Sequence, residues 1–116
     1  MSNKYTVYHN PRCSKSRMAV EYFNEAGKSI EIIEYLKESP TKEELKLVLE
    51  KLNVSAESII RKGEADFKEN FKGSELTDNQ WVEVMIKFPK LIERPIVIKG
   101  HKAVVARPTE LIKDLD

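Results

Sequence analysis

The sequence predicts an α/β domain in which a helical insertion separates two halves of one sheet. Two β-prone runs flank a helical pattern in the first thirty-five residues, and two more precede a short helical pattern at the C-terminus. Between these βαβ and ββα halves, over about 40–89, apolar residues recur at helical spacing without a strand signal. A chain of 116 residues has the usual length of one domain, so we expect a single domain over 1–116.

The N-terminal half is predicted to be strand, helix, strand. Tyr5–Tyr8 is β-prone and Asn10-Pro11 ends it. Helical spacing begins at Ser14 and stops at Gly27, and residues 30–35 are dense in β-branched side chains. This order normally gives parallel strands joined by a right-handed crossover.

The insertion carries two helix-start signals. Thr41 with Glu44, and Thr77 with Gln80, match the capping box, and each is followed by apolar residues on one helical face. Residues 65–71 are expected to add one or two helical turns, and Ile59-Ile60 to precede a helix end. Pro89 is expected to close the last helix of the insertion.

The C-terminal half returns to β structure. Residues 96–98 and 103–105 are predicted strands, with Gly100-His101 as the turn between them. Pro108 is suited to the first turn of a final α-helix that runs to Leu115.

Composition excludes several classes of protein. Twenty Lys and Arg against nineteen Asp and Glu leave a net charge of +1, which provides no field for nucleic acid or an anionic membrane. No apolar stretch is long enough to span a bilayer, and the first residues lack the apolar block of a signal peptide. The one cysteine excludes an internal disulfide and a Cys-rich metal site. We therefore expect a reduced, cytoplasmic protein without a metal, and a monomer, because the helix and strand faces account for its apolar residues.

Cys13 is the candidate nucleophile. It lies where a strand ends and a helix begins, and free N–H groups and the helix dipole favour a thiolate at such a position. Arg12, Lys15 and Arg17 add positive charge and argue against a buried, inert cysteine. A Cys-x-x-Cys pair would need a second cysteine at Ser16, so a thiol that resolves Cys13 must come from another molecule.

Two polar residues precede the cysteine. His9 is a candidate general base or a residue that orients the loop, and the sequence leaves both roles open. The Asn10 amide could hydrogen-bond either the thiolate or the loop backbone.

Four blocks carry a family resemblance. Residues 9–17, His-Asn-Pro-Arg-Cys-Ser-Lys-Ser-Arg, resemble the active-site loop of the ArsC family, the glutaredoxin-dependent arsenate reductases. Residues 59–64, 91–97 and 106–108 are similar to that family's later blocks, in the same order. The resemblance thus extends over nearly the whole chain.

The resemblance implies a thioredoxin-like fold with a mixed four-stranded sheet, and a cis proline at Pro95. It implies that Cys13 attacks arsenate or a similar oxyanion held by Arg61, Arg94 and Arg107. It further implies glutathione as co-substrate and glutaredoxin as partner, with no bound cofactor. The residues expected to support the loop are His9, Asn10, Ser16 and Arg17.

Two alternative functions and one alternative interpretation of the arginines remain open at this point. An ArsC-like protein could act as a glutathione-dependent thiol oxidoreductase on another substrate. An Spx-like transcription regulator is disfavoured, because its Cys-x-x-Cys switch is absent here. Without the resemblance, each arginine would be taken as a solvated surface charge. The sequence also places a carboxylate, Glu93, beside Arg94, with an undetermined effect on anion binding.

Overall fold

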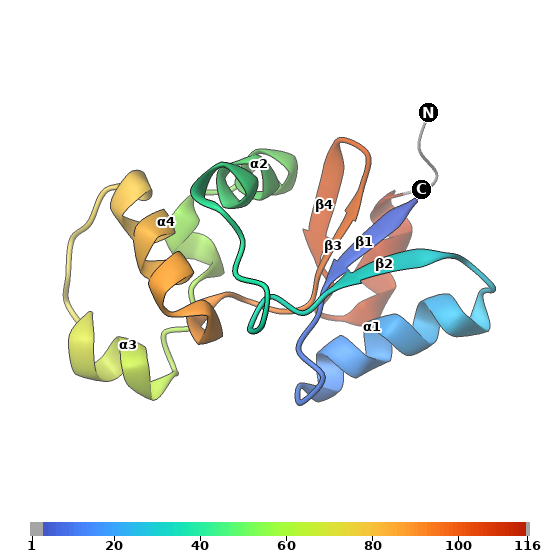
Figure 1. Ribbon diagram of the computed structural model, residues 1–116, viewed down its shortest axis with the longest axis horizontal. Coiled ribbons are helices and arrows are strands. Elements are labelled where there is room, and N and C mark those ends of the chain that lie inside the picture. The colour runs from blue at the N-terminus through green and yellow to red at the C-terminus, as the bar shows by residue number, and fades with distance from the viewer. Residues whose placement is uncertain (1–3, 116) are drawn as a thin grey trace. The chain divides into compact units, whose positions relative to one another are not determined.

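The computed structural model describes residues 4–115, and the chain forms two compact units (Figure 1). The first unit comprises Met1–Glu38 and Arg94–Asp116, and the second comprises Ser39–Glu93. All the strands that the structure describes belong to the first unit, and α2, α3 and α4 belong to the second. The assignment of residues 1–116 to a single domain with an insertion over about 40–89 stays a prediction.

The first unit contains a mixed four-stranded sheet, as predicted. Its strands follow the order β2-β1-β3-β4, with β1 and β2 parallel and the β1–β3 and β3–β4 pairs antiparallel. The bounds are β1 Tyr5–Tyr8, β2 Ile30–Ile33, β3 Ile96–Lys99 and β4 Lys102–Val105. Strand β2 ends two residues earlier than predicted. The β3–β4 turn lies at Gly100-His101, where Gly100 has the positive φ of 60° that favours glycine.

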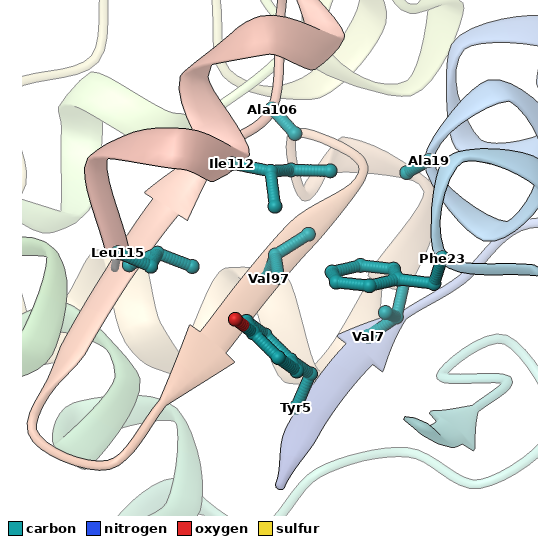
Figure 2. Packing of buried hydrophobic residues seen from close by; sticks show 8 residues of the cluster. All are labelled: Tyr5, Val7, Ala19, Phe23, Val97, Ala106, Ile112 and Leu115. Atoms are coloured by element: carbon teal, nitrogen blue, oxygen red, sulfur yellow. The ribbon is translucent and has the colours of Figure 1, made fainter. Parts of the chain in front are cut away.

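One face of this sheet carries the core of the first unit (Figure 2). Tyr5 and Val7 of β1 and Val97 of β3 point to that face because strand residues alternate sides. Helix α1, Ser14–Glu25, covers it with Ala19 and Phe23. The C-terminal segment adds Ala106, Ile112 and Leu115, so α1 and this segment pack on the same face.

The C-terminal segment is a correction to the prediction. Thr109–Leu115 is a 3₁₀-helix, not an α-helix. Its buried residues, Thr109, Ile112 and Leu115, are three apart. A helix with three residues per turn places such residues directly above one another, so this geometry buries all three on one side.

The second unit contains helices and short 3₁₀ turns. The α-helices are α2 Lys42–Leu52, α3 Ala65–Asn70 and α4 Asp78–Lys87, and the turns are Ala56–Ile59 and Pro89–Leu91. Both predicted capping boxes are present: Thr41 and Glu44 bond each other's backbone N–H, and so do Thr77 and Gln80. No helix within residues 4–115 combines the length and apolar character needed to cross a bilayer.

Phe23→Ala is expected to lower the free energy of unfolding by about 3–5 kcal/mol, because Phe23 is fully buried and its removal leaves a cavity. Its ring packs against Tyr5, with centroids 4.7 Å apart. The measurement is urea denaturation followed by circular dichroism. Met18→Ala, at an exposed position of the same helix, is the control and should change stability by less than about 0.5 kcal/mol. Equal losses in both variants would contradict the assignment of Phe23 to the core.

Candidate active site

Cys13 is the N-cap of α1. Its backbone is extended, with φ −94° and ψ 124°, and its carbonyl accepts the first helical hydrogen bond from the N–H of Arg17 at 3.0 Å. The N–H of Cys13 donates to the carbonyl of Asn10 at 3.0 Å, which closes a tight turn before the helix. The sulfur therefore lies at the end of α1 where backbone N–H groups have no partner within the helix.

The predicted supporting residues are brought together around that turn. Ser16 is fully buried, and its Oγ accepts from the N–H of Asn10 at 3.0 Å. The same Oγ lies 2.6 Å from Nδ1 of His9. Asn10 Oδ1 accepts from the N–H of Arg12, and Arg17 Nη1 donates to the carbonyl of Pro11 at 2.9 Å. These bonds tie the loop to the first turn of α1.

His9 and Asn10 each make one side-chain contact within the loop and the start of α1. The side chain of Asn10 bonds the loop backbone rather than the sulfur, and His9 bonds Ser16. Burial lowers the pKa of His9; Glu34 opposes this shift and Arg17 adds to it. His9 is thus predominantly neutral at neutral pH, which is the form that either a general base or a loop-orienting residue uses, so both roles stay predictions.

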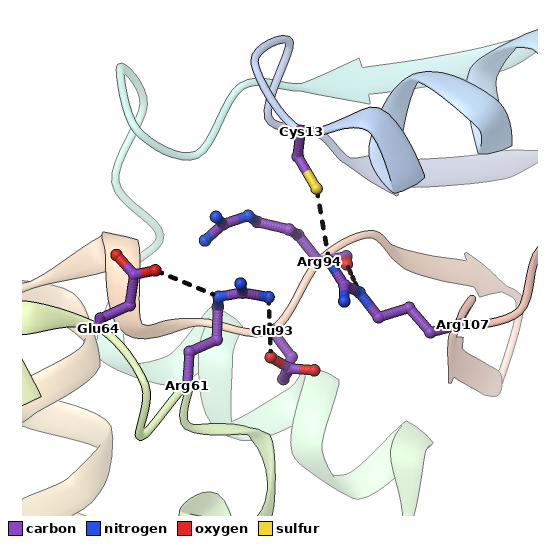
Figure 3. Close-up of polar contacts among 6 residues, drawn as sticks. All are labelled: Cys13, Arg61, Glu64, Glu93, Arg94 and Arg107. Carbon is purple, nitrogen blue, oxygen red and sulfur yellow. Dashed lines mark hydrogen bonds and ion pairs between the residues drawn. The ribbon is translucent and has the colours of Figure 1, made fainter.

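Two arginines reach Cys13 from the β3–β4 hairpin. Arg94 precedes β3 and Arg107 follows β4, so the pairing of Ile96 with Val105 brings both to one end of the hairpin. The Tyr8–Ile96 pairing places the end of β1 beside the start of β3. Arg107 Nη2 lies 3.5 Å from the sulfur, and Arg107 Nε donates to the carbonyl of Arg94 at 2.7 Å (Figure 3).

The Arg94–Pro95 peptide bond is cis, as the resemblance implies. The Arg107–Pro108 bond is also cis, which was not predicted from the sequence. No local signal distinguishes this bond from a trans one, because X-Pro bonds adopt either form at low cost.

The pKa of Cys13 reflects opposing influences. Burial is the largest and raises the pKa, whereas hydrogen bonds to the thiolate lower it. These come, in decreasing order, from the N–H of Ser16, the side chain of Arg94, the N–H of Lys15 and the side chain of Arg107. Together they lower the pKa from its ordinary value of 9.0 to about 7. A large fraction of the sulfur is therefore thiolate at neutral pH, as the helix-start position predicted.

Arg61 belongs to the second unit and is paired with two carboxylates. Its Nη1 lies 3.1 Å from Oε1 of Glu93, and its Nε lies 3.7 Å from Oε2 of Glu64. In the sequence, Glu93 stands out only as the neighbour of Arg94. The spacing of three residues between Arg61 and Glu64 is a local signal for an ion pair, but the pairing with Glu93 links positions 32 apart in sequence.

The geometry can support nucleophilic chemistry on an anion. A poised thiolate, free N–H groups at a helix start and guanidinium groups are the usual means of binding a tetrahedral oxyanion beside a nucleophile. Among residues 4–115, no group of three or more His, Cys, Asp or Glu side chains is placed to hold a metal ion.

Comparisons with known proteins agree with this geometry. The ArsC family model matches residues 8–115. An arsenate reductase of Neisseria meningitidis is 38% identical over 109 residues, which cover 92% of this chain and 93% of that protein. An arsenate reductase of Acidiphilium multivorum is 33% identical over 116 residues, covering 99% of this chain and 82% of that protein. The solved structure of an arsenate reductase from Vibrio cholerae superimposes with a TM-score of 0.92 at 36% identity, over 97% of this chain and 98% of that one. The fold is thioredoxin-like, as the resemblance implied, and the chain belongs to the ArsC family.

Proposed function

We propose that this protein reduces arsenate to arsenite, with Cys13 as nucleophile and with glutathione and glutaredoxin as external thiols. The observation that carries the proposal is the Cys13 sulfur, whose pKa is about 7 and which lies 3.5 Å from Nη2 of Arg107. The arsenate reductases among its relatives support arsenate as the oxyanion.

Arginine side chains would hold the substrate. Arg94 and Arg107 both bond the Cys13 thiolate, so an oxyanion that approaches the sulfur meets their N–H donors. The ArsC resemblance assigns Arg61 to the same oxyanion. Guanidinium groups suit this task because their paired N–H donors match two oxygens of a tetrahedral anion.

The chemistry requires two electrons from outside the chain. The thiolate attacks arsenic and displaces a hydroxide as water, which forms a sulfur–arsenic bond. A glutathione thiolate then attacks the Cys13 sulfur and breaks the sulfur–arsenic bond. The bonding electron pair goes to arsenic, which falls from +5 to +3 and leaves as arsenite, and a Cys13–glutathione disulfide remains for glutaredoxin to reduce. Cys13 is the only cysteine, so no internal disulfide can form. Glutathione and glutaredoxin fit this need, and their requirement for a reducing compartment agrees with a cytoplasmic site of action.

The rate of Cys13 alkylation by iodoacetamide is expected to rise with pH and to inflect near pH 7, because the thiolate is the reactive form and its pKa is lowered to about 7. The rate is measured by quenching the alkylation at a series of times and determining the alkylated fraction by mass spectrometry. Arg107→Ala should move the inflection upward, because it removes one of the donors to the thiolate. An inflection near the ordinary value in the unaltered protein would rule out a poised nucleophile.

Cys13→Ser is expected to abolish arsenate reduction in an assay that couples glutathione, glutaredoxin, glutathione reductase and NADPH oxidation. Serine preserves the shape of the side chain and removes the nucleophilic sulfur. Omission of glutaredoxin from the reaction with the unaltered protein tests the partner separately. Equal rates for both proteins would refute the enzymatic proposal, and full activity without glutaredoxin would refute only that partner.

Arg94→Ala and Arg107→Ala are each expected to lower kcat/KM for arsenate by about 10- to 100-fold. This fold-change corresponds to the free energy lost when one or two hydrogen bonds to a charged group are removed. Thermal melting should change far less than activity. Lys102→Ala, an exposed basic position on β4, is the matched control and should leave both unchanged. If melting falls in proportion to activity, the arginines are structural instead.

A further inference from the structure

A surface groove of about 320 Å³ lies between α1 and the C-terminal 3₁₀-helix, wholly within the first unit. One wall is formed by α1 and the other by the start of the 3₁₀-helix. The lining residues are Met18, Glu21, Tyr22 and Glu25 of α1, and Thr109 and Glu110 of the 3₁₀-helix. The four residues of α1 are spaced three, one and three apart, so they form one stripe along the helix.

Both walls of the groove begin at the Cys13 site. Cys13 is the N-cap of α1, and Arg107, whose Nη2 lies 3.5 Å from the sulfur, stands two residues before the 3₁₀-helix. At a rise of 1.5 Å per residue, Met18 lies about 8 Å and Glu25 about 18 Å beyond Cys13 along α1. A small transient interface covers roughly 600 Å² of each protein, which is a disc about 14 Å in radius. A protein that covers Cys13 with such an interface can therefore also contact the groove.

The groove presents an apolar side chain among carboxylates. Met18 is 46% exposed, and the three carboxylates, Glu21, Glu25 and Glu110, form no ion pair with any residue of 4–115. Thr109 is only 8% exposed, and its buried Oγ1 has no hydrogen-bond partner among the described residues. An exposed apolar side chain, unpaired carboxylates and an unsatisfied hydroxyl together fit a basic segment of another polypeptide.

The positive charges nearby restrict which partner fits. Lys113, one 3₁₀ turn after Glu110, stands beside the groove, so three carboxylates and one ammonium leave a charge of −2. The surroundings of Cys13 are positive instead, and a uniformly basic partner would be repelled there. The cationic residues of that loop and of the hairpin end are Arg12, Lys15, Arg17, Arg94 and Arg107. A partner matches both regions if its basic residues lie to one side of its own reactive sulfur.

We propose that the groove is the docking surface for the thiol protein that regenerates Cys13, and that this partner carries basic residues to one side of its reactive cysteine. The inference rests on the proposed function, which leaves a Cys13–glutathione disulfide for glutaredoxin. In that step the partner's thiolate attacks the glutathione sulfur. A disulfide forms between partner and glutathione, the bond to Cys13 breaks, and Cys13 leaves as the thiolate. Contacts along the groove align the two proteins for this attack.

The test isolates this step from arsenate. Incubation with glutathione disulfide converts Cys13 to its glutathione disulfide, and mass spectrometry then follows removal of the glutathione by reduced glutaredoxin or by glutathione alone. We expect Glu21→Lys and Glu25→Lys each to lower the second-order rate constant with glutaredoxin by about threefold, and the double variant by about tenfold. Met18→Ala should lower it by about threefold. The rate with glutathione alone should change by less than about twofold, because salt at physiological strength screens charges beyond about 8 Å.

Glu31→Lys is the matched control for the single charge reversals. Glu31 is exposed on β2, and it points to the side of the sheet opposite α1, because its neighbour Ile30 packs against the core that α1 covers. This variant should leave both rates unchanged. Thermal melting reports the folding of each variant. If the double variant does not fold, Met18→Ala and Glu110→Gln decide the question, and each should slow only the reaction with glutaredoxin.

An unchanged glutaredoxin rate in the folded groove variants, or an equal loss in Glu31→Lys, would overturn the docking surface and leave the proposed function intact. Equal losses with glutaredoxin and with glutathione alone would locate the effect at Cys13 itself and would overturn it too. If glutaredoxin removes glutathione from the unaltered protein no faster than glutathione does, the partner in the proposed function is wrong, and this inference with it.

Discussion

The candidate site depends on the stabilisation of one partly buried thiolate. Burial alone would raise the pKa of Cys13 and leave the sulfur protonated at neutral pH. The backbone N–H groups of Ser16 and Lys15 and the side chains of Arg94 and Arg107 more than offset this effect. The lowered pKa of Cys13 therefore depends on the start of α1 and on both arginines keeping their positions around the sulfur.

The fold of the first unit provides those positions. Strand β1 leads into the Cys13 loop, and the buried Ser16 ties that loop to the helix behind it. The hairpin of β3 and β4 places Arg94 and Arg107 side by side, and a hydrogen bond from the N–H of Ala106 to the carbonyl of Pro95 closes its open end. Packing of α1 and Thr109–Leu115 on one face of the sheet keeps the Cys13 loop and the β3–β4 hairpin in place. The core and the site are thus built from the same few elements.

Much of this could be predicted because the signals are local. A capping box is complete within four residues, and both boxes form as expected. The helix start at Cys13 likewise predicts the part of the pKa lowering that comes from the nearby N–H groups of Ser16 and Lys15, whereas the part from Arg94 and Arg107 depends on the tertiary structure. The C-terminal helix was predicted with the wrong geometry, because the i, i+3 spacing of Thr109, Ile112 and Leu115 fits a 3₁₀-helix as well as an α-helix. Only packing against the sheet decides between them.

The sequence by itself determined the order of the strands and helices, and it predicts Cys13 as the nucleophile and an external thiol as its partner, because each follows from the type and spacing of neighbouring residues. Only the tertiary structure decided which charged groups meet. It brings Arg107 to a sulfur 94 positions away and pairs Arg61 with Glu93, 32 positions away. Electrostatic interaction depends on distance in space and on burial, and neither can be read from spacing along the chain when the partners lie on different elements.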